Sequence, residues 1–171
     1  MIAHIRRRTS IIIMVCGLAA MVAATVIDPR YCLMYNASTS APLGWYMRVP
    51  VGDPSTNAWV FARLPDAVAA FAAARHYLPL EVLILKPVGA KAGQTVCEQE
   101  GLVRIDGHIV ARAFDHDGAG RPMPRWMGCR ALEDGEFFLL SHHSIDSFDS
   151  RYFGPIPRDA VIGKAIPLWT W

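Results

Sequence analysis

Ser40 and Lys86 are the two residues of this chain whose types and surroundings could together perform chemistry. A serine hydroxyl is a poor nucleophile until a base removes its proton, and a lysine can be that base only when its amine is neutral. Residues 83–88 read Leu-Ile-Leu-Lys-Pro-Val, and burial among such apolar neighbours disfavours the ammonium form. The alternative is a lysine at a strand end whose amine reaches water. The pair suggests hydrolysis through a covalent intermediate.

The stretch around Ser40 favours a rigid bend. Residues 36–46 read Asn-Ala-Ser-Thr-Ser-Ala-Pro-Leu-Gly-Trp-Tyr. Pro42 fixes its own φ and favours extended geometry at Ala41, and Gly44 permits a turn that other residues resist. A serine in such a run can be held exposed and in one orientation.

A third polar segment, residues 144–154, follows a predicted hydrophobic strand. A hydroxyl in this segment could orient a neutral lysine, and Asp149 with Arg151 could brace the wall of a site. The alternative is a solvated loop whose serines cap a helix.

The N-terminus predicts a membrane anchor. Residues 1–10 are basic, and residues 11–27 carry no charge and are almost wholly apolar, about the minimum length of a transmembrane helix. The basic tail should stay in the cytoplasm, which would place residues 28–171 in the periplasm as one domain held by a single pass through the inner membrane. A cleaved signal peptide is the alternative, since small residues suited to cleavage occur at Ala20, Ala23 and Ala24.

Composition favours one compact, mainly β domain. The chain has 171 residues, 53% of them hydrophobic, with 12 prolines and 13 glycines spread along it. A net charge of +2 without a basic face gives no indication of a nucleic-acid partner. One short helix is predicted at 66–75 and a loop at 115–120; strands are predicted at 59–62, 81–86, 95–98, 102–105, 108–110, 136–140 and 160–166.

Of the four cysteines, Cys97 and Cys129 lie in the part predicted to be exported, where disulfides persist. We expect them to form a bridge, with two buried free thiols as the alternative. No spacing fits a Cys-x-x-Cys metal or redox motif. The run Asp115-His116-Asp117 lacks a complete ligand set, so no metal or other cofactor is predicted.

In their order along the chain, these segments resemble the type I signal peptidases, a family of membrane-anchored Ser/Lys proteases. Residues 147–154 read Ser-Phe-Asp-Ser-Arg-Tyr-Phe-Gly and match every fixed position of the family's Ser-x-Asp-Ser-Arg-x-x-Gly segment. Residues 86–94 read Lys-Pro-Val-Gly-Ala-Lys-Ala-Gly-Gln, similar to the family's Lys-Arg-x-x-Gly-x-x-Gly-Asp. The resemblance covers the chain from the anchor to about residue 157 and implies a signal-peptidase-type β domain.

Two departures from that pattern resemble the conjugative-transfer, TraF-type branch. Most signal peptidases have Ser-Met-x-Pro at the nucleophile, whereas residues 40–46 are similar to the branch's Ser-x-Pro-x-Gly-x-Tyr. Ser-His-His-Ser stands at 141–144 in place of the usual Gly-Asp-Asn-Arg, and residues 120–129 also resemble the branch. The branch matures the pilin of a conjugation apparatus, in some systems by joining the pilin's ends. The implied partners are a membrane-bound precursor, either a pilin or a preprotein with a signal peptide, and the lipid bilayer.

The resemblance also implies roles for single residues. Ser40 would be the nucleophile, Lys86 the general base, and Ser147 the hydroxyl that holds the amine. The Ser38 side chain and the Ser40 N–H would form the oxyanion hole. Asp149 and Arg151 would support the site. Thr39 is the alternative nucleophile, because it lies three residues before Pro42, as in the ordinary peptidases.

The sequence leaves other hypotheses open. His142 or His143 with Asp146 and Ser40 could form a Ser-His-Asp triad. The protein could be a housekeeping signal peptidase or a catalytically silent component of a secretion or conjugation machine. The substrate groove could be formed by the helix at 66–75 and the turn at 42–44. Contact with the membrane interface could be made by Trp45, Tyr46, Trp169 and Trp171.

Overall fold

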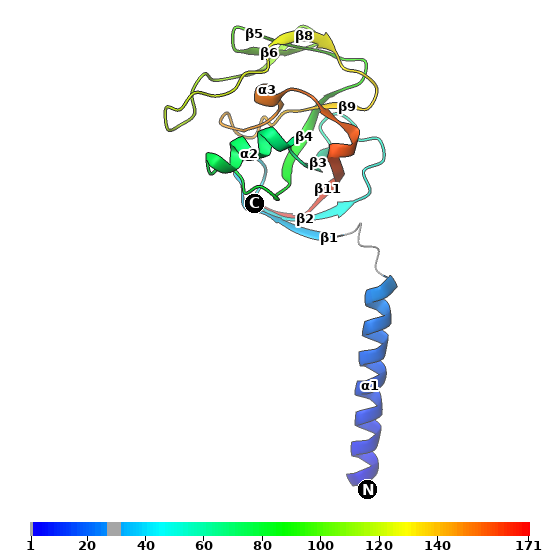
Figure 1. Ribbon diagram of the computed structural model, residues 1–171. Coiled ribbons are helices and arrows are strands. Elements are labelled where there is room, and N and C mark those ends of the chain that lie inside the picture. Colours follow the sequence, from blue (N-terminus) through cyan, green and yellow to red (C-terminus); the bar gives the residue numbers. More distant parts are fainter. Residues whose placement is uncertain (1, 27–31) are drawn as a thin grey trace. The chain divides into compact units, whose positions relative to one another are not determined.

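The computed structural model describes residues 2–26 and 32–171. The chain divides into two units, Met1–Tyr31 and Cys32–Trp171. The first contains helix α1 (Ile2–Val26), shown in Figure 1. Within the described residues no helix is both long enough and apolar enough to cross a membrane. The predicted anchor at 11–27 therefore stays a prediction, and its junction with the predicted domain at 28–171 lies outside the described residues.

The second unit is built on two antiparallel sheets, which confirms the predicted mainly β class (Figure 1). The larger sheet has seven strands in the order β1-β2-β11-β3-β4-β9-β10, and the smaller has four in the order β7-β6-β5-β8. The strands are β1 (Cys32–Asn36), β2 (Gly44–Val49), β3 (Trp59–Ala62), β4 (Ile84–Lys91), β5 (Thr95–Gln99), β6 (Leu102–Ile105), β7 (His108–Arg112), β8 (Gly128–Ala131), β9 (Glu136–Leu139), β10 (Ile156–Pro157) and β11 (Val161–Thr170).

The helices of this unit are few and short. Helix α2 (Asp66–Ala74) lies where the alanine-rich run predicted it. A second helix, α3 (Ser150–Phe153), and a 3₁₀ turn at Arg158–Ala160 were not predicted. Helix α3 forms inside the polar segment because the Asp149 carboxylate accepts a hydrogen bond from the Arg151 backbone N–H and so caps its first turn.

Residues with positive φ form two turns between strands of the smaller sheet. The strands β6 and β7 are joined by Asp106 and Gly107, both with positive φ, as a two-residue hairpin turn of this type requires. Glu100 and Gly101 adopt the same sign of φ between β5 and β6. Cys97 and Cys129 are register partners across β5 and β8, and a disulfide joins them in the structure.

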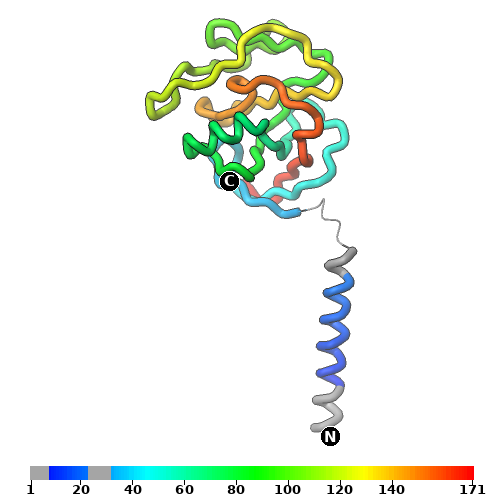
Figure 2. Tube along the Cα trace, in the orientation of Figure 1, coloured from blue at the N-terminus to red at the C-terminus, as the bar shows by residue number. Residues whose placement is uncertain are grey.

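The order of strands in the large sheet brings distant segments together. Strand β4 is flanked by β3 and β9, and the hairpin of β1 and β2 lies against the C-terminal strand β11 (Figure 2). Gly44 begins β2 with φ of 135°, and a Cβ there would lie 2.1 Å from the Trp169 carbonyl oxygen. A glycine is therefore required where the loop of residues 37–43 enters the sheet. Three segments that bear the candidate site residues now converge: this loop, β4, and the chain from β9 to α3.

Two clusters of buried side chains support that convergence. One lies beneath the loop of residues 37–43 and contains Ala41, Tyr46 and Phe61. A second packs Val88 of β4 against Leu139 of β9 and reaches α2. Burial of this apolar surface is the main stabilising contribution to the fold, at roughly 25 cal/mol per Å². The site is thus carried by packed strands.

Candidate active site

The loop that carries Ser40 is held by the side chain of Asn36, the last residue of β1. Its Nδ2 donates to the carbonyl oxygens of Ser38 (2.9 Å), Ala41 (3.2 Å) and Pro42 (3.0 Å), and its Oδ1 accepts from the Ser38 N–H. Tyr46 also donates from its hydroxyl to the Pro42 carbonyl at 2.8 Å. These bonds fix both sides of Ser40, as the bend inferred from the sequence requires.

Lys86 lies on β4 with only 4% of its surface exposed. Its register partner is the fully buried Val60. Burial lowers the pKa of Lys86 from 10.5 to about 8, while the Asp149 charge raises it and the Arg151 charge lowers it. The alternative of a strand-end lysine whose amine reaches water does not fit this burial. An appreciable fraction of the Lys86 amine is neutral near pH 8.

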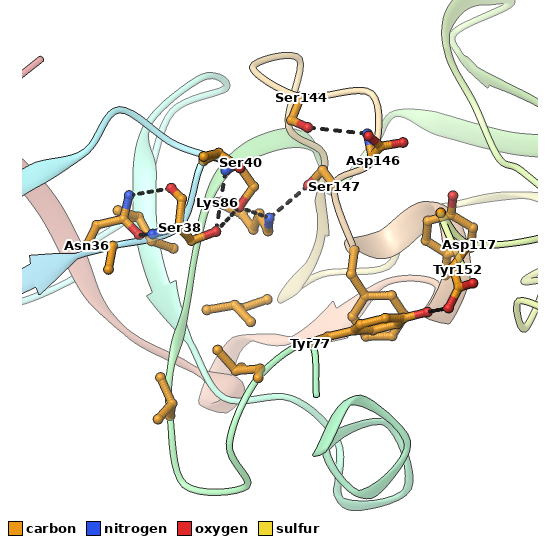
Figure 3. A pocket seen from close by; sticks show the side chains of 18 of the residues that line it. Asn36, Ser38, Ser40, Tyr77, Lys86, Asp117, Ser144, Asp146, Ser147 and Tyr152 are labelled. Atoms are coloured by element: carbon orange, nitrogen blue, oxygen red, sulfur yellow. Dashed lines mark hydrogen bonds between the residues drawn. The ribbon is translucent and has the colours of Figure 1, made fainter. Parts of the chain in front are cut away.

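Ser40, Lys86 and Ser147 form a connected set in Figure 3. Lys86 Nζ lies 2.6 Å from Ser40 Oγ and 2.7 Å from Ser147 Oγ, with a hydrogen bond in each case. Ser147 is 2% exposed, so its hydroxyl is available to the amine and not to bulk water. A neutral amine in this position can accept a proton from one hydroxyl while it donates to the other.

Ser38 lies on the other side of Ser40. The two Oγ atoms are 2.9 Å apart, and the Ser40 backbone N–H donates to Ser38 Oγ at 3.3 Å (Figure 3). The Ser38 hydroxyl and the Ser40 N–H are therefore adjacent donors beside the Ser40 hydroxyl. This is the arrangement that an oxyanion hole needs, provided that an incoming carbonyl oxygen replaces the bond between them.

Asp149 and Arg151 form a buried ion pair behind these groups. Arg151 Nε donates to Asp149 Oδ1 at 2.8 Å, and the two side chains are 3% and 0% exposed. Arg151 Nη1 also donates to the carbonyl oxygens of Arg112 and Ile145. The pair touches neither Ser40 nor Lys86 by a hydrogen bond within the described residues. Its role in the structure is to hold the chain between β9 and α3.

Two residues that shape the site were not singled out from the sequence. Asn36 holds the loop of residues 37–43, and Ser141, 1% exposed, donates from its hydroxyl to the Ser40 carbonyl at 2.6 Å. Ser141 lies 101 positions from Ser40 in the sequence. No local pattern signals a contact over that separation, so only the fold reveals it.

A cleft of about 780 Å³ opens beside Ser40 and Lys86. Its lining includes residues 35–40, residues 82–86 and Ser147. Tyr77, Phe148 and other aromatic and polar groups also line the cleft. Neither helix α2 nor the turn at 42–44 lines this cleft, and α2 packs against the core next to β4. Their part in a substrate groove stays a prediction.

Thr39, His142, His143 and Asp146, the alternative catalytic residues, lack the contacts that catalysis would need. Within the described residues, Lys86 makes its hydrogen bonds to Ser40 and Ser147 and none to Thr39. His142 and His143 are exposed, and neither side chain lines the cleft. Asp146 lines it, but its backbone N–H donates to Ser144 Oγ, 3.3 Å away, and in the described part of the chain its carboxylate makes no hydrogen bond to a histidine. The geometry therefore favours a Ser/Lys pair over a triad.

The acidic loop at 115–120 is held in place by hydrogen bonds to Asp117. Asp117 accepts hydrogen bonds from the Tyr77 hydroxyl, from Arg121 Nε and from two backbone N–H groups, and these donors hold the pKa of its carboxyl well below its usual range. Asp117 thereby ties this loop to the segment after α2. Across the described part of the chain, no group of three or more His, Cys, Asp or Glu side chains could hold a metal ion.

Comparison with known proteins identifies the family. A family model described as signal peptidase, peptidase S26, matches residues 5–170. The chain belongs to this family of type I signal peptidases, and its relatives place it with the TraF-type members. The family supports the assignment of the protein as a serine peptidase.

The relatives carry names from conjugal transfer. The chain is 34% identical over 170 residues to a probable conjugal transfer protein TraF of Sinorhizobium fredii, with 91% of this chain and 88% of the relative covered. It is 31% identical over 149 residues to the plasmid transfer protein TraF of Escherichia coli, with coverage of 80% and 82%. A crystal structure of a signal peptidase I from Enterococcus faecalis matches at 16% identity and a TM-score of 0.39, over 67% of this chain and 97% of that one.

Proposed function

We propose that this protein is a membrane-anchored serine endopeptidase that uses Ser40 and Lys86 to process an exported precursor, the pilin of a conjugative transfer system. The observation that carries the proposal is the buried Lys86 amine, 2.6 Å from Ser40 Oγ in a cleft. The membership of the family and the TraF names of the relatives support the two halves of the proposal, peptidase and conjugal transfer.

The reaction begins when neutral Lys86 takes the proton of Ser40 as Oγ attacks the scissile carbonyl. The Ser147 hydroxyl fixes the amine, so that its lone pair faces Ser40. The negative charge that develops on the carbonyl oxygen is stabilised by the Ser40 N–H and the Ser38 hydroxyl.

The tetrahedral intermediate then collapses to an acyl-enzyme. The scissile C–N bond breaks, and the Lys86 ammonium gives its proton to the leaving amine, which restores the neutral base. The ester of Ser40 is next attacked by water, or by a second amine, whose proton passes to Lys86. Ser40 is released by the reverse of the first proton transfer.

The proposed location rests on the charge-free, apolar sequence of residues 11–27. We place residues 11–27 in the inner membrane and the Ser/Lys domain in the periplasm, where it would meet a membrane-bound precursor. Trp45, Trp169 and Trp171 are exposed and can reach a lipid interface, whereas Tyr46 is buried, so the prediction for Tyr46 was wrong. The precursor would bind as an extended strand in the cleft, with small side chains next to Ser40.

The pH dependence of the rate tests the role of Lys86. Because the base must be neutral, kcat/KM for a peptide substrate should rise with pH, about tenfold per unit below the midpoint, and level off above a pKa of about 8. The matched control is a variant with both His142→Ala and His143→Ala, which should keep the same midpoint. A midpoint that disappears in this control would favour the triad hypothesis.

The cellular role is tested by Ser40→Ala in the native operon. Conjugative transfer and mating pili should be lost while the export of ordinary proteins continues, because only the precursor of the transfer system is processed by this enzyme. Ser55→Ala, at an exposed serine that does not line the cleft, controls for expression. Accumulation of many secretory precursors with normal mating would indicate a housekeeping peptidase. Normal transfer by Ser40→Ala would indicate a catalytically silent component.

A further inference from the structure

Ser141 connects the buried ion pair to the backbone of Ser40. Each polar group of Ser141 has a partner. Its backbone N–H donates to Asp149 Oδ2 at 3.0 Å, and its carbonyl accepts from Arg151 Nη2 at 2.8 Å. Both members of the ion pair are therefore hydrogen-bonded to the main chain of Ser141.

The direction of the remaining hydrogen bonds is fixed by the partners. The His143 backbone N–H, which can only donate, lies 3.2 Å from Ser141 Oγ. The Ser40 carbonyl, which can only accept, lies 2.6 Å from the same oxygen. The Ser141 hydroxyl must therefore accept from His143 and donate to Ser40.

We propose that Ser141 is a positioning residue that sets the backbone orientation of the nucleophile Ser40. This inference rests on the proposed function. A bond to the Ser40 carbonyl restrains the peptide between Ser40 and Ala41, and with it ψ of Ser40. That angle helps to decide where the Ser40 N–H and the Ser40 hydroxyl point relative to Lys86.

The proposal also gives the Asp149–Arg151 pair a function that its own contacts do not show. The pair does not reach Ser40 or Lys86 by a hydrogen bond among the described residues, but Ser141 does reach Ser40. The sequence of contacts runs from the ion pair to the Ser141 main chain, and from the Ser141 hydroxyl to the nucleophile. Asn36 holds the same loop through the carbonyl oxygens of Ser38, Ala41 and Pro42.

The test compares Ser141→Ala and Ser141→Cys in the purified full chain. Alanine removes the donor, and cysteine replaces the oxygen with a sulfur that donates only weakly. Because an error of about 1 Å in the position of a reacting group can cost about 100-fold, kcat for peptide cleavage should fall by about 10- to 100-fold in both variants. KM should change by less than about twofold, since the walls of the cleft are intact.

Two readouts separate positioning from loss of structure. The rate is expressed per active site, with sites counted by complete reaction with a serine-reactive inhibitor, so that an unfolded fraction does not count. The midpoint of the pH profile should not move, because Lys86 keeps its partners. The matched control is Ser150→Ala, which removes another buried hydroxyl, the acceptor for the Leu139 N–H at 2.9 Å, without contact with Ser40. Its kcat per site should equal that of the wild type.

Ser40→Ala is measured in the same series. If it still cleaves the peptide, the proposed function fails, and the proposal for Ser141 fails with it. If Ser40→Ala is inactive while Ser141→Ala or Ser141→Cys turns over at the wild-type rate per site, the proposal for Ser141 alone is overturned.

Discussion

Replacement of Ser40 by alanine, or of Lys86 by methionine, should abolish cleavage of the precursor and leave the fold intact. Each change removes one member of a unit that works only when complete, so kcat should fall by about 10⁴- to 10⁶-fold in either variant. The double variant should be no worse than either single variant, because the second change removes nothing that still functions. Cleavage of purified precursor, followed by gel shift and mass spectrometry, measures the effect.

Thr39→Val is the matched control for this experiment. It removes the hydroxyl next to Ser40 in sequence, which makes no hydrogen bond to Lys86 within the described residues. Its activity should stay close to that of the wild type. Activity that is lost in Thr39→Val and kept in Ser40→Ala would move the nucleophile to Thr39.

Loss of the Asp149 carboxylate should have the largest effect on stability. Asp149→Ala leaves the Arg151 guanidinium buried without its counter-ion, and breaking a buried pair in this way costs ~3–5 kcal/mol of the free energy of unfolding. When Arg151→Met is added, the total loss should be smaller than the sum of the two single losses, because no uncompensated charge remains. Urea unfolding of the full chain in detergent, followed by tryptophan fluorescence, measures these values.

The Lys91–Asp53 ion pair provides the comparison. Its N–O distance of 2.9 Å is similar, but the Asp53 side chain is 78% exposed. Exposed pairs contribute ~0–1 kcal/mol, so Asp53→Ala should change the free energy of unfolding little. An effect of Asp149→Ala as small as that of Asp53→Ala would contradict a structural role for the buried pair.

Strands with strong local signals were predictable from the sequence. β3 lies at Trp59–Ala62 as its β-branched and aromatic residues indicated, and the Asp106-Gly107 turn separates two strands of a hairpin. β4 differs: it begins at Ile84, later than predicted, and continues through Pro87 to Lys91. A proline in a sequence that reads as a strand usually marks the end of the strand, because it cannot donate a hydrogen bond to a neighbouring strand. Here the segment pairs with both β3 and β9, and the strand continues past Pro87.

Other elements depend on partners that no local pattern reveals. β1 and β2 were not predicted, because their residues become strands by pairing with each other and with β11, more than 100 positions further along the chain. The same limit applies to the site. Ser40 and Lys86 could be selected from chemistry and from the resemblance, but the contact of Ser141 with the Ser40 carbonyl depends on how the loop after β9 folds.

Covalent labelling tests the Ser40/Lys86 assignment most directly. The purified full chain is treated with a mechanism-based, serine-reactive peptidase inhibitor, and the modified residue is located by peptide mass spectrometry. We expect one adduct, on Ser40, which forms faster as the pH rises through about 8 and is absent in Lys86→Met. An adduct on Thr39, or an adduct on Ser40 that forms equally fast in Lys86→Met, would contradict the assignment.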